Sequence, residues 1–126
     1  MSRERIIIGK SGEDIALDFL KKQDYHIIER NFKSRLGELD IIAKDRNTVC
    51  FVEVKTRTSS DKGTGFESIT KAKQHKLSKL ALAYLKTHNL LKQKARFDVV
   101  SVELDGLSNK TELIKNAFSL DSRYTY

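Results

Sequence analysis

The sequence predicts an α/β protein in which one mixed β-sheet is flanked by helices. Two long segments carry apolar residues at helical spacing, and the other apolar segments are rich in Ile, Val and Phe, as strands are. An order of helix, strand, two-strand hairpin, helix, strand and strand favours a single sheet of about five strands with helices packed on it. We expect helices over 10–23 and 69–88, a hairpin over 37–57, and strands over 25–32, 96–104 and 113–118.

Length and composition limit the class of protein. A chain of 126 residues with 39% hydrophobic residues can bury a core of its own, so we expect residues 1–126 to form a single domain. The net charge of +7 favours a polyanionic partner, first of all nucleic acid. A lysine-rich surface that only keeps the protein soluble would carry the same charge, and both interpretations stay open.

Cysteine content and the N-terminal segment indicate the cellular setting. Cys50 is the single cysteine, which excludes an intrachain disulfide and a thiolate metal site. The apolar run Ile6–Ile8 is too short for a signal peptide or a membrane span. We therefore expect a cytoplasmic protein with no membrane segment.

The hairpin over 37–57 carries charged side chains at one end of otherwise apolar strands. Asp45, Arg46 and Asn47 supply the turn, since Asn and Asp tolerate the left-handed backbone that a tight turn needs. Side chains alternate between the faces of a strand. Glu38, Asp40 and Ile42 therefore share one face of the first strand. Val49, Phe51, Glu53 and Lys55 share one face of the second. If the strands pair, Asp40 lies beside Glu53 and Lys55.

Two adjacent carboxylates and a lysine are the equipment for metal-assisted hydrolysis of a phosphodiester. Asp40 and Glu53 repel one another and favour a cation between them. Mg2+ takes oxygen ligands of this kind and keeps several waters. Lys55 could then orient or deprotonate a water, or contact a phosphate oxygen. A salt-bridge cluster at a sheet edge would need the same residue types, so the residues alone leave both interpretations open.

The first helix presents an acidic residue to its packed face. Ser11 is the expected N-cap, and at 100° per residue Glu13 falls at the edge of the apolar stripe that includes Ala16 and Leu20. Asp14 falls on the solvent side. An acidic residue near a helix N-terminus is favourable in itself, but Asp14 satisfies that preference equally well, so the inward direction of Glu13 needs another explanation.

Three basic residues are candidates for phosphate contacts. The polar segment over 56–65 follows Lys55 directly and carries Arg57 and Lys62, so we interpret it as a flap over substrate. A plain connection would have the same composition. Lys73 lies on the inward stripe of the second helix, where it either contacts phosphate or extends its aliphatic stem along the apolar surface.

Several short motifs occur in one order along most of the chain. They are Gly12-Glu13 with Ala16, Arg30-Asn31, Gly37–Asp40, Phe51–Arg57, Lys73-Gln74, Arg96–Val100 and Asn116–Phe118. The chain thereby resembles the YraN-like family of bacterial proteins, which is similar to archaeal Holliday-junction resolvases. The Asp and Glu-x-Lys pattern resembles the restriction-endonuclease-like nucleases. The proline that precedes the Asp in that wider superfamily is Leu39 here.

The resemblance implies a restriction-endonuclease-like fold and a Mg2+- or Mn2+-dependent DNA endonuclease. Asp40 and Glu53 would hold the metal with help from Glu13, and Lys55 would position the attacking water. Glu38 would support them, although a salt bridge to Lys55 or Arg57 explains it equally well. The expected nucleic-acid contacts are Arg57, Lys62 and Lys73. Similarity to resolvases implies branched or junction DNA as substrate and a homodimer on it.

Two other functional classes stay open. In one, the domain keeps the nuclease fold and binds nucleic acid through its basic surface without cutting it. In the other, the protein is a structural or adaptor protein whose charged cluster is only a network of ion pairs. A metal between Asp40 and Glu53 would separate the enzyme from both.

Overall fold

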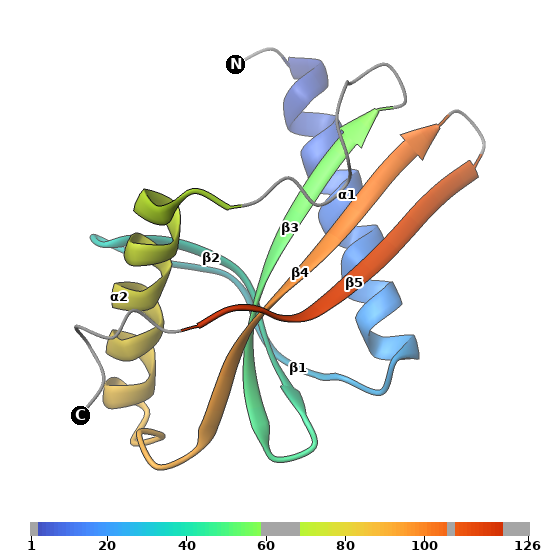
Figure 1. The fold of residues 1–126 in the computed structure, drawn as a ribbon. Helices are drawn as coiled ribbons and strands as arrows, with labels where there is room; N and C mark the ends of the chain where they lie inside the picture. The colour runs from blue at the N-terminus through green and yellow to red at the C-terminus, as the bar shows by residue number, and fades with distance from the viewer. Residues whose placement is uncertain (1–2, 59–68, 106–107, 120–126) are drawn as a thin grey trace.

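The structure is a computed structural model that describes residues 3–58, 69–105 and 108–119 (Figure 1). Within these ranges, two helices and five strands follow one another. Their bounds are α1 (Arg3–Lys22), β1 (His26–Ser34), β2 (Gly37–Asp45), β3 (Thr48–Thr58), α2 (Lys71–Thr87), β4 (Lys94–Asp105) and β5 (Ser108–Phe118). Neither helix within the described ranges is long and apolar enough to cross a membrane.

The five strands form one mixed sheet in sequence order, β1-β2-β3-β4-β5. Strands β3 and β4 are parallel, whereas the other three neighbouring pairs are antiparallel. A parallel pair needs a crossover connection, and α2 lies on it. The prediction of an α/β fold with a mixed five-stranded sheet flanked by helices is confirmed.

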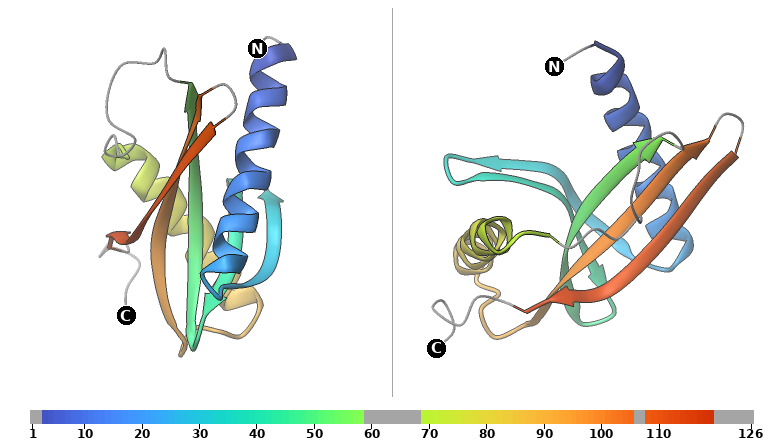
Figure 2. Two further views of the ribbon diagram at one scale, coloured as in Figure 1. Left: turned by 90° about the vertical axis from the view of Figure 1, so that its right-hand side faces the viewer. Right: turned by 45° about the horizontal axis from the view of Figure 1, so that its top comes forward.

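The two helices cover opposite faces of the sheet, as the edge-on view in Figure 2 shows. On the α1 face, Ala16 and Leu20 pack on a cluster that contains the even-numbered Cys50 and Val52 of β3. On the α2 face, Leu77, Leu80 and Tyr84 pack on a cluster that contains Val49 and Phe51. The alternation predicted for β3 is therefore confirmed, and it places Glu53 on the α2 face.

Helix α1 is longer than predicted. It begins at Arg3, so Ser11 lies inside the helix and is not its N-cap. The segment over 3–8 contains neither glycine nor proline, and isoleucine lowers helix propensity only slightly, so no local signal stops the helix there. Helix α2 closely follows the prediction and is capped by Thr70, whose Oγ1 accepts a hydrogen bond of 3.1 Å from Lys73 N–H.

The last strand is also longer than predicted. Strand β5 begins at Ser108 and not near 113, and Asn109 pairs with Leu104 of β4. An edge strand has one partner and tolerates polar side chains, so apolar alternation is a weak guide to its length. Strand β3 extends to Thr58, and the rest of the predicted flap, including Lys62, lies outside the described residues.

A buried polar cluster joins the end of α1 to the middle of the sheet. Asp98 is fully buried and accepts hydrogen bonds from Tyr25 Oη at 2.8 Å, Arg96 Nε at 2.9 Å and the backbone N–H of Asn116 at 2.9 Å. Arg96 Nη2 also donates to Tyr25 Oη at 2.9 Å. A buried charge with this many partners holds its neighbours in one arrangement. These contacts give the Arg96–Val100 and Asn116–Phe118 motifs a structural explanation.

Candidate active site

The site begins where β2 separates from β3. The antiparallel register runs from Asp45↔Thr48 to Ile41↔Val52, and beyond it β2 bends away toward α2 (Figure 1). At this point Asp40 Oδ2 accepts a hydrogen bond of 2.8 Å from the backbone N–H of Val54. A side-chain carboxylate thus replaces a backbone acceptor just beyond the last pair, which fixes the orientation of Asp40.

Glu53 lies directly against Asp40. The Glu53 carboxylate is close enough for its charge to act on Asp40, and the Glu53 side chain is only 12% exposed. Burial, followed by the charge of Glu53, raises the pKa of Asp40 to about 7, while the Val54 N–H and Lys73 act in the opposite direction. The pair therefore holds a proton below neutral pH and favours a cation above it.

Helix α2 places a lysine on this pair. Lys73 Nζ lies 3.6 Å from Glu53 Oε1. Between the helix and the sheet is a pocket of about 340 Å3 whose walls carry opposite charges. Acidic residues line the sheet and α1 side, and basic and apolar residues line the α2 side. The lining residues are Glu13, Glu38, Asp40, Lys73, Lys76, Leu77 and Leu80.

The predicted helix phase of Glu13 and Asp14 is confirmed. The Glu13 side chain lines the pocket and is 23% exposed, whereas that of Asp14 is 65% exposed. Burial, then the charge of Asp40, raises the pKa of Glu13, and Arg30 opposes this. A Cβ added at Gly12 would collide with the Thr56 side chain, so glycine allows α1 to approach β3 closely there.

Asn31 links the two outer carboxylates. It has a left-handed backbone with φ of 54°, which Asn tolerates better than most residues. With its amide nitrogen turned toward the carboxylates, it donates to Glu13 Oε2 at 3.1 Å and to Glu38 Oε1 at 3.2 Å. Glu38 is exposed and forms no ion pair with Lys55 or Arg57 in the described part of the chain. Glu38 therefore belongs to the Glu13 side of the pocket.

The structure does not bring every candidate residue to the pocket. Lys55 is exposed on β3, and within the described ranges its ammonium forms no ion pair with Asp40 or Glu53. Arg57 Nη2 lies 3.9 Å from Glu103 Oε2 on β4, its register partner. Strand β2 has already diverged from β3 at these positions, so Lys55 and Arg57 follow β3 away from Asp40.

Comparison with known proteins assigns the chain to a family. Residues 12–102 match the profile of the Uncharacterised protein family UPF0102. The chain belongs to the UPF0102 family. A UPF0102 protein of Desulfosudis oleivorans is 48% identical over 94% of each chain, and one of Geobacter metallireducens is 44% identical over 95% of this chain and 98% of its own. One of Trichlorobacter lovleyi is 50% identical over 90% and 91%.

The match confirms the resemblance to YraN-like proteins at the level of the family. The matched range of the UPF0102 chain includes every residue that lines the pocket between α2 and the sheet. It also includes the Asp40, Glu53 and Lys73 side chains that carry the electrostatics of that pocket.

The metal that the resemblance implies needs oxygen ligands, and the carboxylates of the pocket are ligands of this type. In the described part of the chain, no three His, Cys, Asp or Glu side chains form a group ready to hold a metal ion. Asp40 and Glu53 supply two carboxylates in contact, and Mg2+ commonly binds one or two carboxylates and completes its coordination with water and substrate oxygens. Asp40 and Glu53 fit such an ion. Glu13 lines the same pocket, but it does not form a three-carboxylate cluster with them in the described part of the chain.

Sequence reasoning missed two residues of the pocket. Lys76 was not among the predicted site residues, yet it lines the pocket beside Lys73, which lies three residues earlier on α2. Spacing of three places both lysines on neighbouring parts of one helix face, which could have indicated this. Asn31 was part of a motif without a role. Its linking position depends on the contact between α1 and β1, which no local pattern encodes.

Proposed function

We propose that this UPF0102 protein is a Mg2+- or Mn2+-dependent deoxyribonuclease of the restriction-endonuclease-like superfamily. The observation that carries the proposal is the geometry around Asp40: Val54 N–H holds its carboxylate in a pocket that Lys73 and Lys76 also line, and Glu53, which Lys73 contacts, lies beside it. Two carboxylates held together at such a cost in repulsion favour a bound cation. The lysines opposite them suit the phosphate of a substrate.

Each residue of the pocket has a distinct role in this proposal. Asp40 and Glu53 would hold the ion, which when bound supplies Lewis-acid polarisation of the phosphate and activation of water. The Val54 N–H keeps Asp40 in place. Lys73 and Lys76 would bind phosphate oxygens, and charge that develops in the transition state would be stabilised by them.

The remaining candidates act around this centre. Lys55, exposed on the same strand as Glu53, would orient the attacking water when substrate covers the site. Glu13 would support Asp40 electrostatically, and Asn31 would hold Glu13 and Glu38 in position. Arg57 would contact the DNA backbone beyond β3 after its ion pair with Glu103 breaks.

DNA with a branched structure is the proposed substrate. The net charge of +7 suits a polyanion, and the sequence carries no zinc finger, helix-turn-helix or long basic helix that would read base edges. Basic residues of this kind contact the phosphate backbone, which gives affinity without sequence preference. Selectivity would then come from the shape of the DNA, and symmetrical cutting of a junction would require a homodimer.

The test is cleavage of four-way junctions, flaps and linear duplex of mixed sequence, with Mg2+, Mn2+ or EDTA. Asp40→Ala and Glu53→Ala should each lower the metal-dependent rate by about a thousandfold or more. Asp18→Ala removes an exposed carboxylate of α1 and should leave the rate unchanged. Full activity in Asp40→Ala would show that the nuclease is a contaminant. Binding of DNA without cutting, under several metals, would favour the alternative that follows.

One observation favours a nucleic-acid-binding protein without catalysis. The ion pair between Lys73 and Glu53 already compensates part of the charge of the carboxylate pair without any metal. In that case the cluster would stabilise the packing of α2 on the sheet, and Asp40→Asn would leave DNA binding unchanged.

A further inference from the structure

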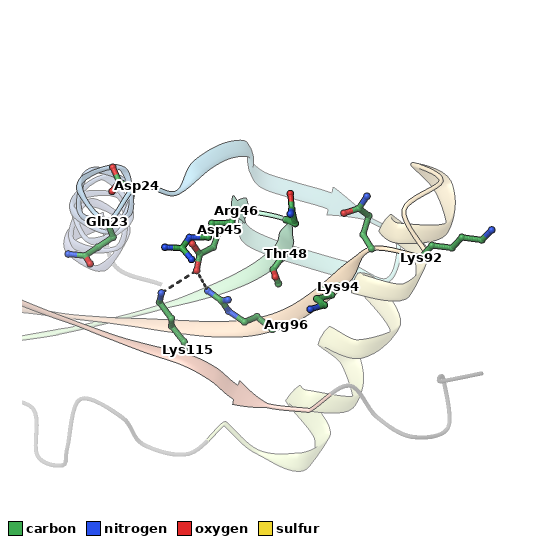
Figure 3. Close-up of a pocket in the computed structure, with 11 residues that line it drawn as sticks. Gln23, Asp24, Asp45, Arg46, Thr48, Lys92, Lys94, Arg96 and Lys115 are labelled. Atoms are coloured by element: carbon green, nitrogen blue, oxygen red, sulfur yellow. Dashed lines mark hydrogen bonds and ion pairs between the residues drawn. The ribbon is translucent and has the colours of Figure 1, made fainter.

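A second cleft lies at the opposite end of the sheet from the carboxylate pair. It is bounded by the β2–β3 turn, the C-terminal end of α1 and the segment that precedes β4 (Figure 3), and its volume is about 760 Å3. Five basic side chains and two acidic ones line it, a surplus of three positive charges. The charged lining residues are Asp24, Asp45, Arg46, Lys92, Lys94, Arg96 and Lys115.

The cleft is separate from the candidate active site. Asp45 follows Asp40 by five positions on β2, which corresponds to roughly 17 Å along a strand. The basic residues of the floor also belong to the other face of the sheet, because Arg96 contacts Tyr25, which packs in the α1 cluster. A ligand of this cleft would not contact Asp40 and Glu53 of the same chain through the same phosphates.

The floor of the cleft is a neutralised and fixed charge cluster. Asp45 Oδ2 accepts hydrogen bonds from Arg96 Nη2 at 2.6 Å and Lys115 Nζ at 3.2 Å (Figure 3). The Arg96 guanidinium is in turn held by the buried Asp98. The acidic residue at the base therefore does not repel an anion, since its charge is compensated by two cations.

Three basic residues at the rim remain available to a ligand. Arg46, Lys92 and Lys94 are exposed, and none of them forms an ion pair in the ranges that the structure describes. Arg46 occupies the tight turn after Asp45 with a left-handed φ of 58°, so the turn sets where its side chain starts. Lys92 lies in the connection between α2 and β4, and Lys94 is the first residue of β4.

The chemistry of the lining selects a class of ligand. Every described residue that lines the cleft is polar or charged, and none of these residues is aromatic or aliphatic. Sites for small organic molecules are mostly apolar with a few polar groups, and stacking of bases uses aromatic side chains. Repeated phosphates need only closely spaced cations. We infer that this cleft is a second binding site for the phosphodiester backbone of a nucleic acid strand, held by Arg46, Lys92 and Lys94.

Binding at this cleft does not require cleavage, and EDTA prevents metal-dependent cleavage during the test. Binding of fluorescein-labelled single-stranded DNA to the full chain is measured by fluorescence anisotropy in EDTA, over a series of salt concentrations. The double variant Lys92→Ser/Lys94→Ser is compared with Lys79→Ser/Lys86→Ser, which removes two exposed lysines of α2 that line neither pocket. Thermal melting confirms that both variants are folded.

The expected result separates a site from general charge. Losing two phosphate contacts should lower affinity about tenfold at low salt and reduce the slope of log K against log salt by about 1.8 for duplex or 1.4 for single strands. The α2 variant should keep the wild-type slope. Equal slopes in both variants would overturn the inference, because the charge would then act only at long range.

A second measurement locates the ligand. In amide NMR spectra, the oligonucleotide should shift signals of Arg46, Asn47 and the 92–94 segment, also in the Asp40→Asn variant. Inorganic phosphate and anionic lipid vesicles serve as competing probes. Shifts confined to the Asp40 pocket would overturn the inference. It would also be overturned if vesicles displaced the DNA from the cleft, or if inorganic phosphate did so at a concentration equal to that of the DNA phosphates.

Discussion

Lys73 Nζ lies 3.6 Å from Glu53 Oε1, so a side chain of α2 provides a cation to the carboxylate pair. The Lys73 side chain is 43% exposed and its contact spans the space between helix and sheet. In such a position the ammonium partly compensates the pair without a metal. It would have to share Glu53 with any metal ion that binds there.

Replacing Lys73 should therefore strengthen the binding of a metal ion and weaken the binding of substrate phosphate. Lys73→Ala removes a competing cation worth about 1 kcal/mol or less at a partly exposed pair, so Mn2+ should bind about two- to fivefold more tightly. Cleavage should nevertheless fall, because a phosphate contact is lost. Isothermal titration calorimetry and cleavage assays measure the two effects, with Lys79→Ala as control. Weaker Mn2+ binding in Lys73→Ala would contradict the competing role.

Lys55 is expected to act on the rate and not on binding. Lys55→Ala should lower the single-turnover cleavage rate by about a hundredfold or more, because a group that orients water acts mainly in the transition state. DNA affinity measured in EDTA should change little, since Lys55 is exposed on β3 and lies beyond the carboxylate pair. If Lys55→Ala lost affinity and rate in the same proportion, Lys55 would be a phosphate contact.

The neighbours Glu13 and Asp14 offer a matched pair of acidic residues. Glu13→Gln should weaken metal-dependent cleavage, because Glu13 faces Asp40 and lines the pocket. Asp14→Asn should have no effect on cleavage, since its contact is to Arg30 at the surface. Rates measured over a range of Mg2+ concentrations test this. Equal losses in both variants would show that Arg30, which contacts both, is responsible.

The stability of the folded chain should depend on the protonation of Asp40. Its pKa is about 7 in the folded protein and near the ordinary 3.8 when unfolded, so the folded state holds more protons between these values. Stability should therefore fall as pH rises through this window, by up to about 1.4 kcal/mol per pH unit. Above neutral pH, Mg2+ should restore part of the loss.

Asp40→Asn is the variant that isolates this effect. The amide oxygen can still accept from Val54 N–H, and the amide nitrogen can donate to Glu53, so the contacts remain while the charge is gone. Urea unfolding should show a flatter pH dependence in this variant and no gain from Mg2+. Asp14→Asn should keep the wild-type pH dependence. An unchanged slope in Asp40→Asn would mean that another group titrates.

Local periodicity was sufficient to predict much of the fold and part of the site. The faces of β3 and the directions of Glu13 and Asp14 follow from the strand and helix repeats, and both predictions agree with the structure. The meeting of Asp40 and Glu53 follows from the register of one hairpin. Each of these relationships lies within one element or between two elements joined by a tight turn.

Relationships that depend on bends and on distant elements were not predictable. Alternation placed Leu39 opposite Ile42, yet both pack in the α2 cluster, because β2 bends toward α2 beyond its last pair with β3 (Figure 1). The same bend separates Lys55 from Asp40. Lys76 reaches the pocket only because the β1–β2 hairpin folds onto α2, where Gly37 allows close approach to Lys76 and Leu80.

The hydrogen bond from Val54 N–H to Asp40 limits which residues can replace Asp40 during the evolution of the family. In the proposed function Asp40 would hold a metal, and its carboxylate also completes the backbone bonding of the sheet, so it could not be lost for one purpose alone. A lineage that abandoned catalysis would still be under selection for an acceptor at this position, and asparagine would satisfy it. Asparagine there, with Glu53 retained, would be the expected mark of a descendant that kept the architecture after its chemistry was no longer needed.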